Sequence, residues 1–225
     1  MSEENEIVYV VDDEAGMRKA LTRLLRAEGF DVQAFPSARD FFSAYRAEQT
    51  ACLILDVAMP ELDGIELQRR LARAGVALPI VFLTGKGDIP TSVHAIKAGA
   101  VDFLTKPVRG KALVAAVRAA IDKDASVRRA RADTAELRQR LASLTPRERE
   151  VLEALAAGSL TKQIAWDLGI TEQTVKFHRA RIMERMQART TAELMHIAVR
   201  LGIGGATPPD AAGPSVISSR KAPRT

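Results

Sequence analysis

Short apolar runs alternate with amphipathic stretches over the first half of the chain. Five runs consist mostly of β-branched and aliphatic residues and predict strands over 7–12, 31–35, 51–56, 78–84 and 100–105. The stretches after them place apolar residues three and four positions apart, which predicts helices over 14–28, 37–47, 65–74, 90–98 and 110–122. Runs without polar alternation are typical of strands buried on both faces. With right-handed crossovers, the pattern predicts an α/β fold with a doubly wound, five-stranded parallel sheet.

Residues 125–144 have a different character, because they are charged, rich in Ala and contain neither Gly nor Pro. Apolar or small residues recur there at alternating steps of three and four, which is a heptad-like pattern. The positions of this seam are Val127, Ala130, Thr134, Leu137, Leu141 and Leu144. The segment is predicted to be a helical linker, and two interpretations stay open: a short coiled coil or a solvated helical connector.

Residues 145–203 have the pattern of a small all-α domain of four short helices. Thr145-Pro146-Arg147-Glu148 has the composition of a capping box with Pro at the first helical position. Two later helices, capped by Thr161 and Thr171, are joined by a tight turn at Gly169, which indicates a helix-turn-helix motif. We expect Trp166 to be partly in the core rather than a platform for a ligand. The segment 204–225 is rich in Gly, Pro and Ser and is expected to be disordered.

Charge and composition narrow the class of protein. Residues 1–124 carry 16 Lys and Arg against 18 Asp and Glu, whereas residues 125–225 carry 17 against 10. The basic half predicts an anionic partner, with double-stranded DNA as the leading candidate. No apolar run approaches the ~20 residues of a membrane span, and there is one cysteine, so we expect a cytoplasmic protein without a membrane contact.

Polar side chains follow the predicted strands where each strand ends. The first strand ends in Asp12 and Asp13, the third in Asp56, the fourth in Thr84 and the fifth in Lys106. Ligands of doubly wound sheets bind beyond these carboxyl ends. Three carboxylates close together favour a hard cation such as Mg²⁺. A carboxylate, a cation, a lysine and a hydroxyl suit phosphoryl transfer to the carboxylate. Each of these residues, taken alone, is explained equally well as a helix cap or a solvated side chain. Because four strand ends supply complementary groups together, however, a functional site is favoured.

Four segments carry a resemblance to a known family: VVDDE (10–14), LILDVAMPELDG (53–64), FLTGKGD (82–88) and KAGAVDFLTKP (97–107). They resemble the receiver domain of two-component response regulators, a flavodoxin-like fold, and in particular its FixJ-like branch. The resemblance covers residues 6–122. It implies that Asp56 accepts a phosphoryl group from a sensor histidine kinase.

The same resemblance implies roles for the neighbouring residues. Asp13 is implied to bind Mg²⁺ directly and Asp12 through water, with Asp56 and the carbonyl oxygen of Ala58 as further ligands. Lys106 is implied to contact the phosphoryl group, with a cis peptide bond to Pro107. Thr84 is implied to be the switch hydroxyl, coupled to an aromatic residue at Phe103, where family members often carry Tyr.

The sequence LTPREREVLEALAAGSLTKQIAWDLGITEQTVKFHRARIMERM (144–186) is similar to the NarL/LuxR-type DNA-binding domain, and the match extends to Ile203. The helix from Glu172 is implied to be the recognition helix, with Lys176 and Phe177 at base edges in the major groove. Candidate phosphate contacts are Lys162, Thr174, His178 and Arg179. Arg181 departs from many members, and it makes either a contact special to this chain or none.

We therefore predict a transcription regulator that dimerises and binds promoter DNA when Asp56 is phosphorylated. The predicted domains are a receiver over 1–124, the linker over 125–144 and the DNA-binding domain over 145–203. The expected partners are a sensor histidine kinase, DNA and a second copy, with RNA polymerase as a further candidate. A phosphatase or phosphotransferase with an aspartyl intermediate is disfavoured, because Val57 and Ala58 offer no second acid and the sequence has no inserted segment for a substrate cap. A DNA-binding protein that needs no phosphorylation stays an open alternative.

Overall fold

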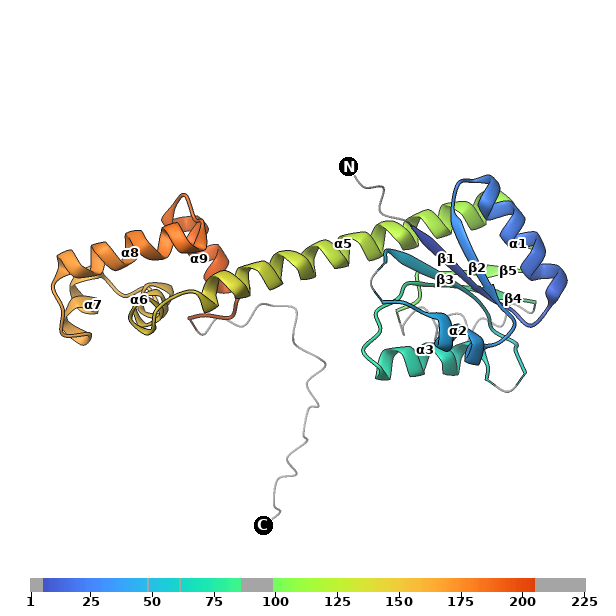
Figure 1. Ribbon diagram of the computed structural model, residues 1–225, viewed down its shortest axis with the longest axis horizontal. Helices are drawn as coiled ribbons and strands as arrows, with labels where there is room; N and C mark the ends of the chain where they lie inside the picture. Colours follow the sequence, from blue (N-terminus) through green and yellow to red (C-terminus); the bar gives the residue numbers. More distant parts are fainter. Residues whose placement is uncertain (1–5, 48, 61, 86–98, 205–225) are drawn as a thin grey trace, which may run out of the picture. The chain divides into compact units, whose positions relative to one another are not determined.

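The computed structural model describes residues 6–47, 49–60, 62–85 and 99–204 (Figure 1). The chain divides into two compact units, residues 1–130 and 131–225. The elements of the first unit are β1 (Ile7–Val11), α1 (Ala15–Ala27), β2 (Asp31–Phe35), α2 (Ala38–Ala44), β3 (Ala51–Asp56), α3 (Gly64–Arg73), β4 (Ile80–Thr84), β5 (Asp102–Thr105) and the first part of α5 (Gly110–Ala142). The helix expected over 90–98 lies outside the described residues.

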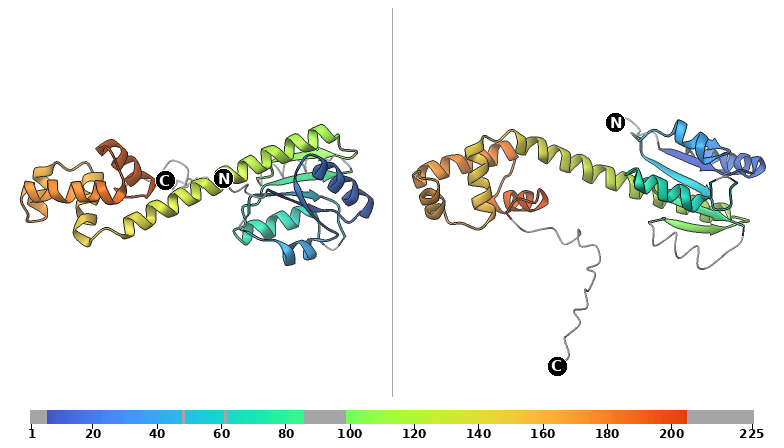
Figure 2. Two further views of the ribbon diagram at one scale, coloured as in Figure 1. Left: turned by 45° about the horizontal axis from the view of Figure 1, so that its top comes forward. Right: turned by 90° about the horizontal axis from the view of Figure 1, so that it is seen from below.

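The five strands form one parallel sheet in the order β2-β1-β3-β4-β5, which confirms the predicted fold class. Residues of β1, β3 and β4 are buried along their whole length. Tyr9 and Leu53 pack with α2 and α3 on one face, and Val10 and Ile54 pack with α1 and α5 on the other (Figures 1 and 2). Both faces are therefore covered, as strands without polar alternation require.

Helix α2 is shorter than the predicted 37–47, because the chain leaves the helix after Ala44. Tyr45 has an extended ψ of 134° instead of a helical value. Its ring packs into an aromatic cluster, with centroids 5.6 Å from Tyr9 and 5.5 Å from Phe41. The packing of this ring outweighs the good helical propensity of Arg46 and Ala47, and a pattern of spacing alone does not reveal it.

Helix α5 is longer than predicted. The expected end at Asp122 is wrong, because the helix continues to Ala142. Its later part has no Gly or Pro and is rich in the strong helix formers Ala and Arg. Two residues beyond the expected end bind the first unit: the buried carboxylate of Asp124 accepts from the Ala51 N–H at 3.0 Å and from Arg128 Nε at 2.6 Å. Arg128 also donates to the Ala47 carbonyl oxygen at 2.8 Å.

Within its described residues, 131–204, the second unit contains the end of α5 and four further helices, as predicted for residues 145–203 (Figure 1). They are α6 (Pro146–Ala156), α7 (Thr161–Asp167), α8 (Glu172–Met186) and α9 (Thr191–Arg200). Thr145 and Glu148 form the predicted capping box of α6. Thr171 caps α8 as predicted, since its hydroxyl accepts from the Thr174 N–H. The cap assigned to Thr161 is wrong: Leu160 precedes α7, and its N–H donates to Gln163 Oε1 at 2.8 Å.

The core of the second unit also takes in the last part of the heptad-like seam. Leu137 and Leu144 are buried against the helices of this unit, and Leu141 packs against the same cluster. These three positions are therefore occupied by contacts within the chain. Of the tail expected over 204–225, all but Gly204 lies outside the described residues. Within the described part of the chain, no helix is both long and apolar enough to cross a membrane.

The Asp124 contacts generate a prediction about stability. Asp124→Ala removes the acceptor for the Ala51 N–H and the partner of Arg128, so both groups lose a hydrogen bond at a site that is 3% exposed. We expect the free energy of unfolding to fall by about 1–3 kcal/mol in urea denaturation. The control is Asp122→Ala, an exposed acidic residue of the same helix, which should change stability by less than ~0.5 kcal/mol. Equal losses in the two variants would contradict a specific role for Asp124.

Candidate functional site

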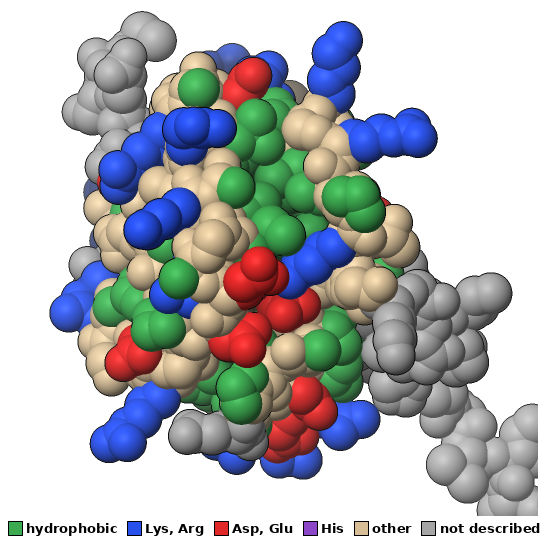
Figure 3. Space-filling view, turned by 90° about the vertical axis from the view of Figure 1, so that its right-hand side faces the viewer, with side chains coloured by type: hydrophobic (Ala, Val, Ile, Leu, Met, Phe, Trp, Pro, Cys, Tyr) green, Lys and Arg blue, Asp and Glu red, His purple; other side chains and the backbone are tan. Residues whose placement is uncertain are grey.

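Three carboxylates meet at the carboxyl ends of β1 and β3. Asp12, Asp13 and Asp56 each offer an oxygen atom within 4.8 Å of the others. The pairing of Val11 with Leu55 in the parallel register brings the two strand ends to the same height. Asp12 and Asp56 are buried, at 1% and 5% exposure, whereas Asp13 is exposed. The face shown in Figure 3 carries acidic side chains close together near its centre, beside a basic side chain.

Lys106 brings a positive charge to these carboxylates from the end of β5. Its Nζ lies 2.7 Å from Asp12 Oδ2 and 3.2 Å from Asp56 Oδ2. Its backbone N–H donates to the Thr84 carbonyl oxygen at 2.7 Å, next to the last pair of the β4–β5 register. The peptide bond between Lys106 and Pro107 is cis, as the resemblance implies. The strand ends therefore gather the polar groups that the sequence places after them.

Burial and the neighbouring charges shift the pKa values of Asp56 and Lys106. Burial raises the pKa of Asp56, and Asp12 adds to this, although the Lys106 ammonium and the Ala58 N–H act in the opposite direction. Burial lowers the pKa of Lys106, but the hydrogen bond and charge of Asp12, together with Asp56, outweigh it and raise the pKa overall. One ammonium faces three carboxylates, so the cluster keeps an excess of negative charge that a hard cation would offset.

The oxygens of the cluster fit a magnesium ion in their chemistry. Asp12 Oδ1 accepts from the Glu14 N–H at 2.8 Å, and Asp12 Oδ2 accepts from Lys106. Asp13, in contrast, is exposed and therefore accessible to an incoming ion. Hard oxygen donors from carboxylates, backbone carbonyls and water are the ligands that Mg²⁺ prefers.

The two residues expected to act as a switch lie on neighbouring strands. Thr84 is 5% exposed at the end of β4. Phe103, on β5, is half-buried and packs against the core, with its ring centroid 5.9 Å from that of Phe82. The aromatic side chain is thus directed toward the core in this structure.

Two residues near the site were missed by the sequence analysis. A Cβ atom on Gly64 would lie 2.4 Å from the Asp56 carbonyl oxygen, so only glycine allows α3 to start this close to β3. Arg18 NH1 donates to the Asp12 carbonyl oxygen at 2.7 Å and fixes the backbone beside the carboxylates. The glycine lies inside a quoted motif, LILDVAMPELDG, but its spacing gives no hint of the contact.

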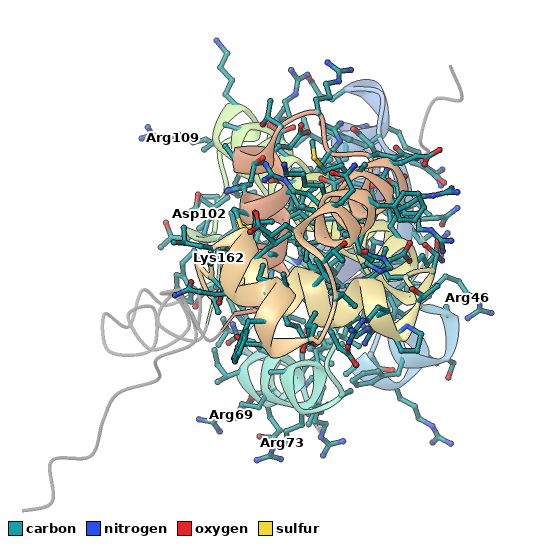
Figure 4. All side chains as sticks on the ribbon, turned by 90° about the vertical axis from the view of Figure 1, so that its left-hand side faces the viewer. Arg46, Arg69, Arg73, Asp102, Arg109 and Lys162 are labelled. Carbon is teal, nitrogen blue, oxygen red and sulfur yellow. The ribbon has the colours of Figure 1, made fainter. Side chains whose placement is uncertain are left out.

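The predicted DNA-binding residues lie mainly on α8. Lys176 is exposed, Phe177 is 57% exposed, and His178 is half-buried. Thr174 takes part in the cap of α8, with its hydroxyl 2.8 Å from that of Thr171. Lys162 is exposed on α7 and is labelled in Figure 4. The outward surface of the two helices therefore carries basic groups beside an aromatic ring.

Several arginines of the second unit bind the domain itself. Arg179, a predicted phosphate contact, donates to the Thr191 hydroxyl. Arg185 donates to the Ser143 carbonyl oxygen. Others bind carbonyl oxygens near helix ends in the same way: Arg147 with Leu168, Arg149 with Leu141, and Arg140 with Met186. Part of the positive charge that pointed to DNA thus stabilises the fold.

The expectation that Trp166 belongs to the core is wrong, because its side chain is 87% exposed. Helix α7 has only seven residues, and its buried side is made by Ile164 and Ala165. The next position along a helix points away from that side. Trp166 therefore faces outward, where it lines a surface pocket of about 890 Å³ together with Lys162 and Glu172.

The close approach of Gly64 to β3 generates a prediction. Gly64→Ala forces α3 away from the Asp56 carbonyl oxygen, and we expect it to lower the free energy of unfolding by about 1–3 kcal/mol. The control is Gly16→Ala in α1, where the nearest atom to a new Cβ is 3.8 Å away. That change should stabilise by about 0.5–1 kcal/mol, because alanine favours the helix. Thermal and urea unfolding measure both, and a neutral Gly64→Ala would contradict the clash.

Comparisons with known proteins agree with this architecture. The model of the response regulator receiver domain matches residues 8–118, and that of the bacterial regulatory proteins of the luxR family matches residues 142–198. Nodulation protein W of Bradyrhizobium diazoefficiens is 45% identical over 197 residues, which cover 88% of this chain and 87% of that protein. Transcriptional regulatory protein FixJ of the same organism is 41% identical over 196 residues, which cover 87% of this chain and 96% of FixJ.

Solved structures give the same result. The response regulator StyR, known at low resolution, has a TM-score of 0.77 and 44% identity over 86% of this chain and 98% of its own. Full-length FixJ from B. japonicum has a TM-score of 0.53 and 41% identity, and the match covers 87% of this chain and 97% of FixJ. The chain therefore belongs to the FixJ-like response regulators with a luxR-type DNA-binding domain, which are phosphorylation-activated transcription regulators and not enzymes.

Proposed function

We propose that Asp56 is the phosphoacceptor of this response regulator and that a sensor histidine kinase supplies the phosphoryl group. The observation that carries the proposal is the position of the Asp56 carboxylate, 3.2 Å from Lys106 Nζ within a cluster of carboxylates at the strand ends. An aspartate in this setting has a neighbouring cation and polar surroundings at the edge of the sheet. Asp12 and Asp13, which follow β1, belong to the same cluster.

The transfer itself is a displacement at phosphorus. An oxygen of the ionised Asp56 attacks the phosphorus of a phosphohistidine, a new P–O bond forms, and the P–N bond breaks. The imidazole nitrogen of the kinase leaves with the electron pair of that bond and takes up a proton from solvent. Lys106 is placed to offset the charge of the phosphoryl oxygens, since its ammonium already lies beside the attacking carboxylate.

The carboxylate cluster is proposed to hold Mg²⁺. Asp13 and Asp56 are the direct ligands, the carbonyl oxygen of Ala58 completes the protein donors, and Asp12 acts through water. The hydrogen bonds that Asp12 accepts from Glu14 and Lys106 support its indirect role. When bound, the ion supplies charge neutralisation at the phosphoryl oxygens. The exposure of Asp13 supports a site that exchanges its ion with solvent.

Activation is proposed to pass through Thr84 and Phe103. The hydroxyl of Thr84 would hydrogen-bond the new phosphoryl group, and its movement would alter the packing of Phe103 on the adjacent strand. The backbone hydrogen bond from Lys106 to Thr84 supports this coupling, because it joins the ends of β4 and β5. Phe103 has no hydroxyl, unlike the tyrosine that family members often carry at this position. Only the packing of its ring would therefore respond to the movement of Thr84.

The output is proposed to be binding of promoter DNA by a dimer. Helix α8 would enter the major groove, with Lys176 and Phe177 at base edges and two half-sites about 10 base pairs apart. Lys162, Thr174 and His178 are proposed phosphate contacts, whereas Arg179 would position α8 through its bond to Thr191. RNA polymerase is a further proposed partner.

The domain limits of the sequence analysis stay our proposal, with residues 125–144 as a connector. The packing of Leu137, Leu141 and Leu144 in the core of the second unit supports a connector over a coiled coil, because these positions already have partners within the chain. A seam that ran between two chains would need these leucines on its surface. The proposed dimer surface therefore lies on the receiver domain.

The phosphoacceptor assignment is tested with acetyl phosphate, Mg²⁺ and intact-mass measurement. We expect one phosphoryl adduct on the wild type and none on Asp56→Asn, because the amide oxygen is a poor nucleophile. The matched control is Asp31→Asn, an exposed aspartate where β2 begins, which should keep the adduct. Addition of EDTA should suppress the adduct on the wild type. An adduct that persists on Asp56→Asn would refute the assignment.

A further inference from the structure

Phe177 and Arg181 form an exposed pair on the outward side of α8. The buried side of this helix is made by Val175, Ile182 and Met186. Phe177 is 57% exposed, and the guanidinium carbon of Arg181 lies 5.5 Å from the centroid of its ring. Residues four apart in a helix lie on the same face. The two side chains therefore present one continuous surface to a binding partner.

Arg181 differs from the other two arginines of α8. Arg179 donates to the Thr191 hydroxyl, and Arg185 donates to the Ser143 carbonyl oxygen, so both are held by their own domain. Arg181 has a loose ion pair with Glu184, at 3.8 Å between two exposed side chains. Such pairs contribute little in water. The guanidinium donors of Arg181 are thus available to a ligand while the ring of Phe177 limits their motion.

The pair has a chemistry that phosphate contacts do not require. A lysine is enough for a phosphate oxygen, and an exposed phenyl ring adds nothing to that contact. In the major groove, however, a phenyl ring contacts the C5-methyl group of thymine, and a guanidinium binds O6 and N7 of guanine with two hydrogen bonds. A ring 5.5 Å from the guanidinium carbon restricts the side chain of Arg181 and so limits the directions in which its donors point.

We propose that Phe177 and Arg181 act together as a specificity element that reads two neighbouring base pairs, a thymine by its methyl group and a guanine by O6 and N7. The inference rests on the proposed entry of α8 into the major groove. Adjacent base pairs are stacked about 3.4 Å apart, so groups separated by 5.5 Å span between one and two steps of the stack and can contact neighbouring pairs. Ala180, three residues after Phe177, is exposed and has a short side chain, so it would not compete with the pair for the groove.

The first part of the test identifies the operator. Full-length protein carrying one phosphoryl adduct selects binding sites from random duplex DNA, and we expect each half-site to contain a thymine next to a guanine. Arg181→Lys keeps the charge but loses the fork of donors, so it should select sites with a weaker preference at the guanine, and Arg181→Ala should select sites with none. The control Arg200→Ala removes one exposed charge from α9 and should select the wild-type sequence.

The second part uses single-atom changes in the selected duplex. Replacing the guanine by 7-deazaguanine removes N7, and replacing the thymine by deoxyuridine removes the methyl group. We expect 7-deazaguanine to weaken wild-type binding about five-fold or more, and deoxyuridine to weaken it less. Arg181→Ala should be insensitive to 7-deazaguanine, and Phe177→Ala should be insensitive to deoxyuridine.

The outcomes separate this inference from the proposed function. If Arg181→Ala weakens binding equally on all duplexes and still responds to 7-deazaguanine, Arg181 contacts phosphate and the inference is overturned. A wild type that selects a motif without adjacent thymine and guanine also overturns it, but leaves the proposed function intact. A phosphorylated wild type that selects no sequence at all contradicts the proposed function itself.

Discussion

The close approach of three carboxylates and one ammonium at the edge of the sheet is the constraint on which the rest of the first unit depends. Asp12 and Lys106 are 94 residues apart, yet their side chains are 2.7 Å apart. They meet because every strand of a doubly wound parallel sheet ends at the same edge. The height of each strand is fixed by its apolar side chains, which are buried on both faces. A shift of one residue in β3 would turn Asp56 away and bury the wrong set of side chains.

The polar groups of the second unit serve a different purpose, because its arginines hold helix ends together. Arg147, Arg149 and Arg185 each donate to a carbonyl oxygen in or next to another helix or turn. Such carbonyls near helix ends lack partners within the helix, and a guanidinium can supply one without burying its charge fully. A small helical domain with a modest core gains from these contacts. The consequence for function is that net charge overstates how much of the surface is directed at DNA.

Much of the fold and of the site could be predicted, since both follow from local patterns. The strands were visible as apolar runs, and Asp12, Asp13, Asp56 and Lys106 stood at their ends or directly after them, so the topology alone brought these residues together. The contacts that were missed depend on tertiary packing. The pairing of Asp124 with the Ala51 N–H requires the rotation of α5 over the sheet, which its composition does not encode.

The exposure of side chains and the ends of helices also depend on tertiary packing, in both units. A tryptophan is usually buried, and only the shortness of α7 and the position of its core residues place Trp166 in solvent. The change in composition after residue 124 suggested a boundary, although helical propensity is continuous through it. The composition of a segment indicates what its side chains contact, whereas its helical propensity indicates its backbone conformation. In α5 the composition changes after residue 124, but the helix continues to Ala142.

The contacts of Lys106 explain how a small chemical change at Asp56 could act beyond the site. Its ammonium is shared between Asp12 and Asp56, and its backbone is bonded to Thr84. On the proposed function, phosphoryl oxygens would compete with Asp12 for this ammonium, because they carry more charge than a carboxylate. Movement of Lys106 then acts on the ends of β4 and β5, and Phe103 lies on the second of these strands. The aromatic ring packs against Phe82 of β4, so a change in the spacing of the two strand ends has to be met by a change in this packing.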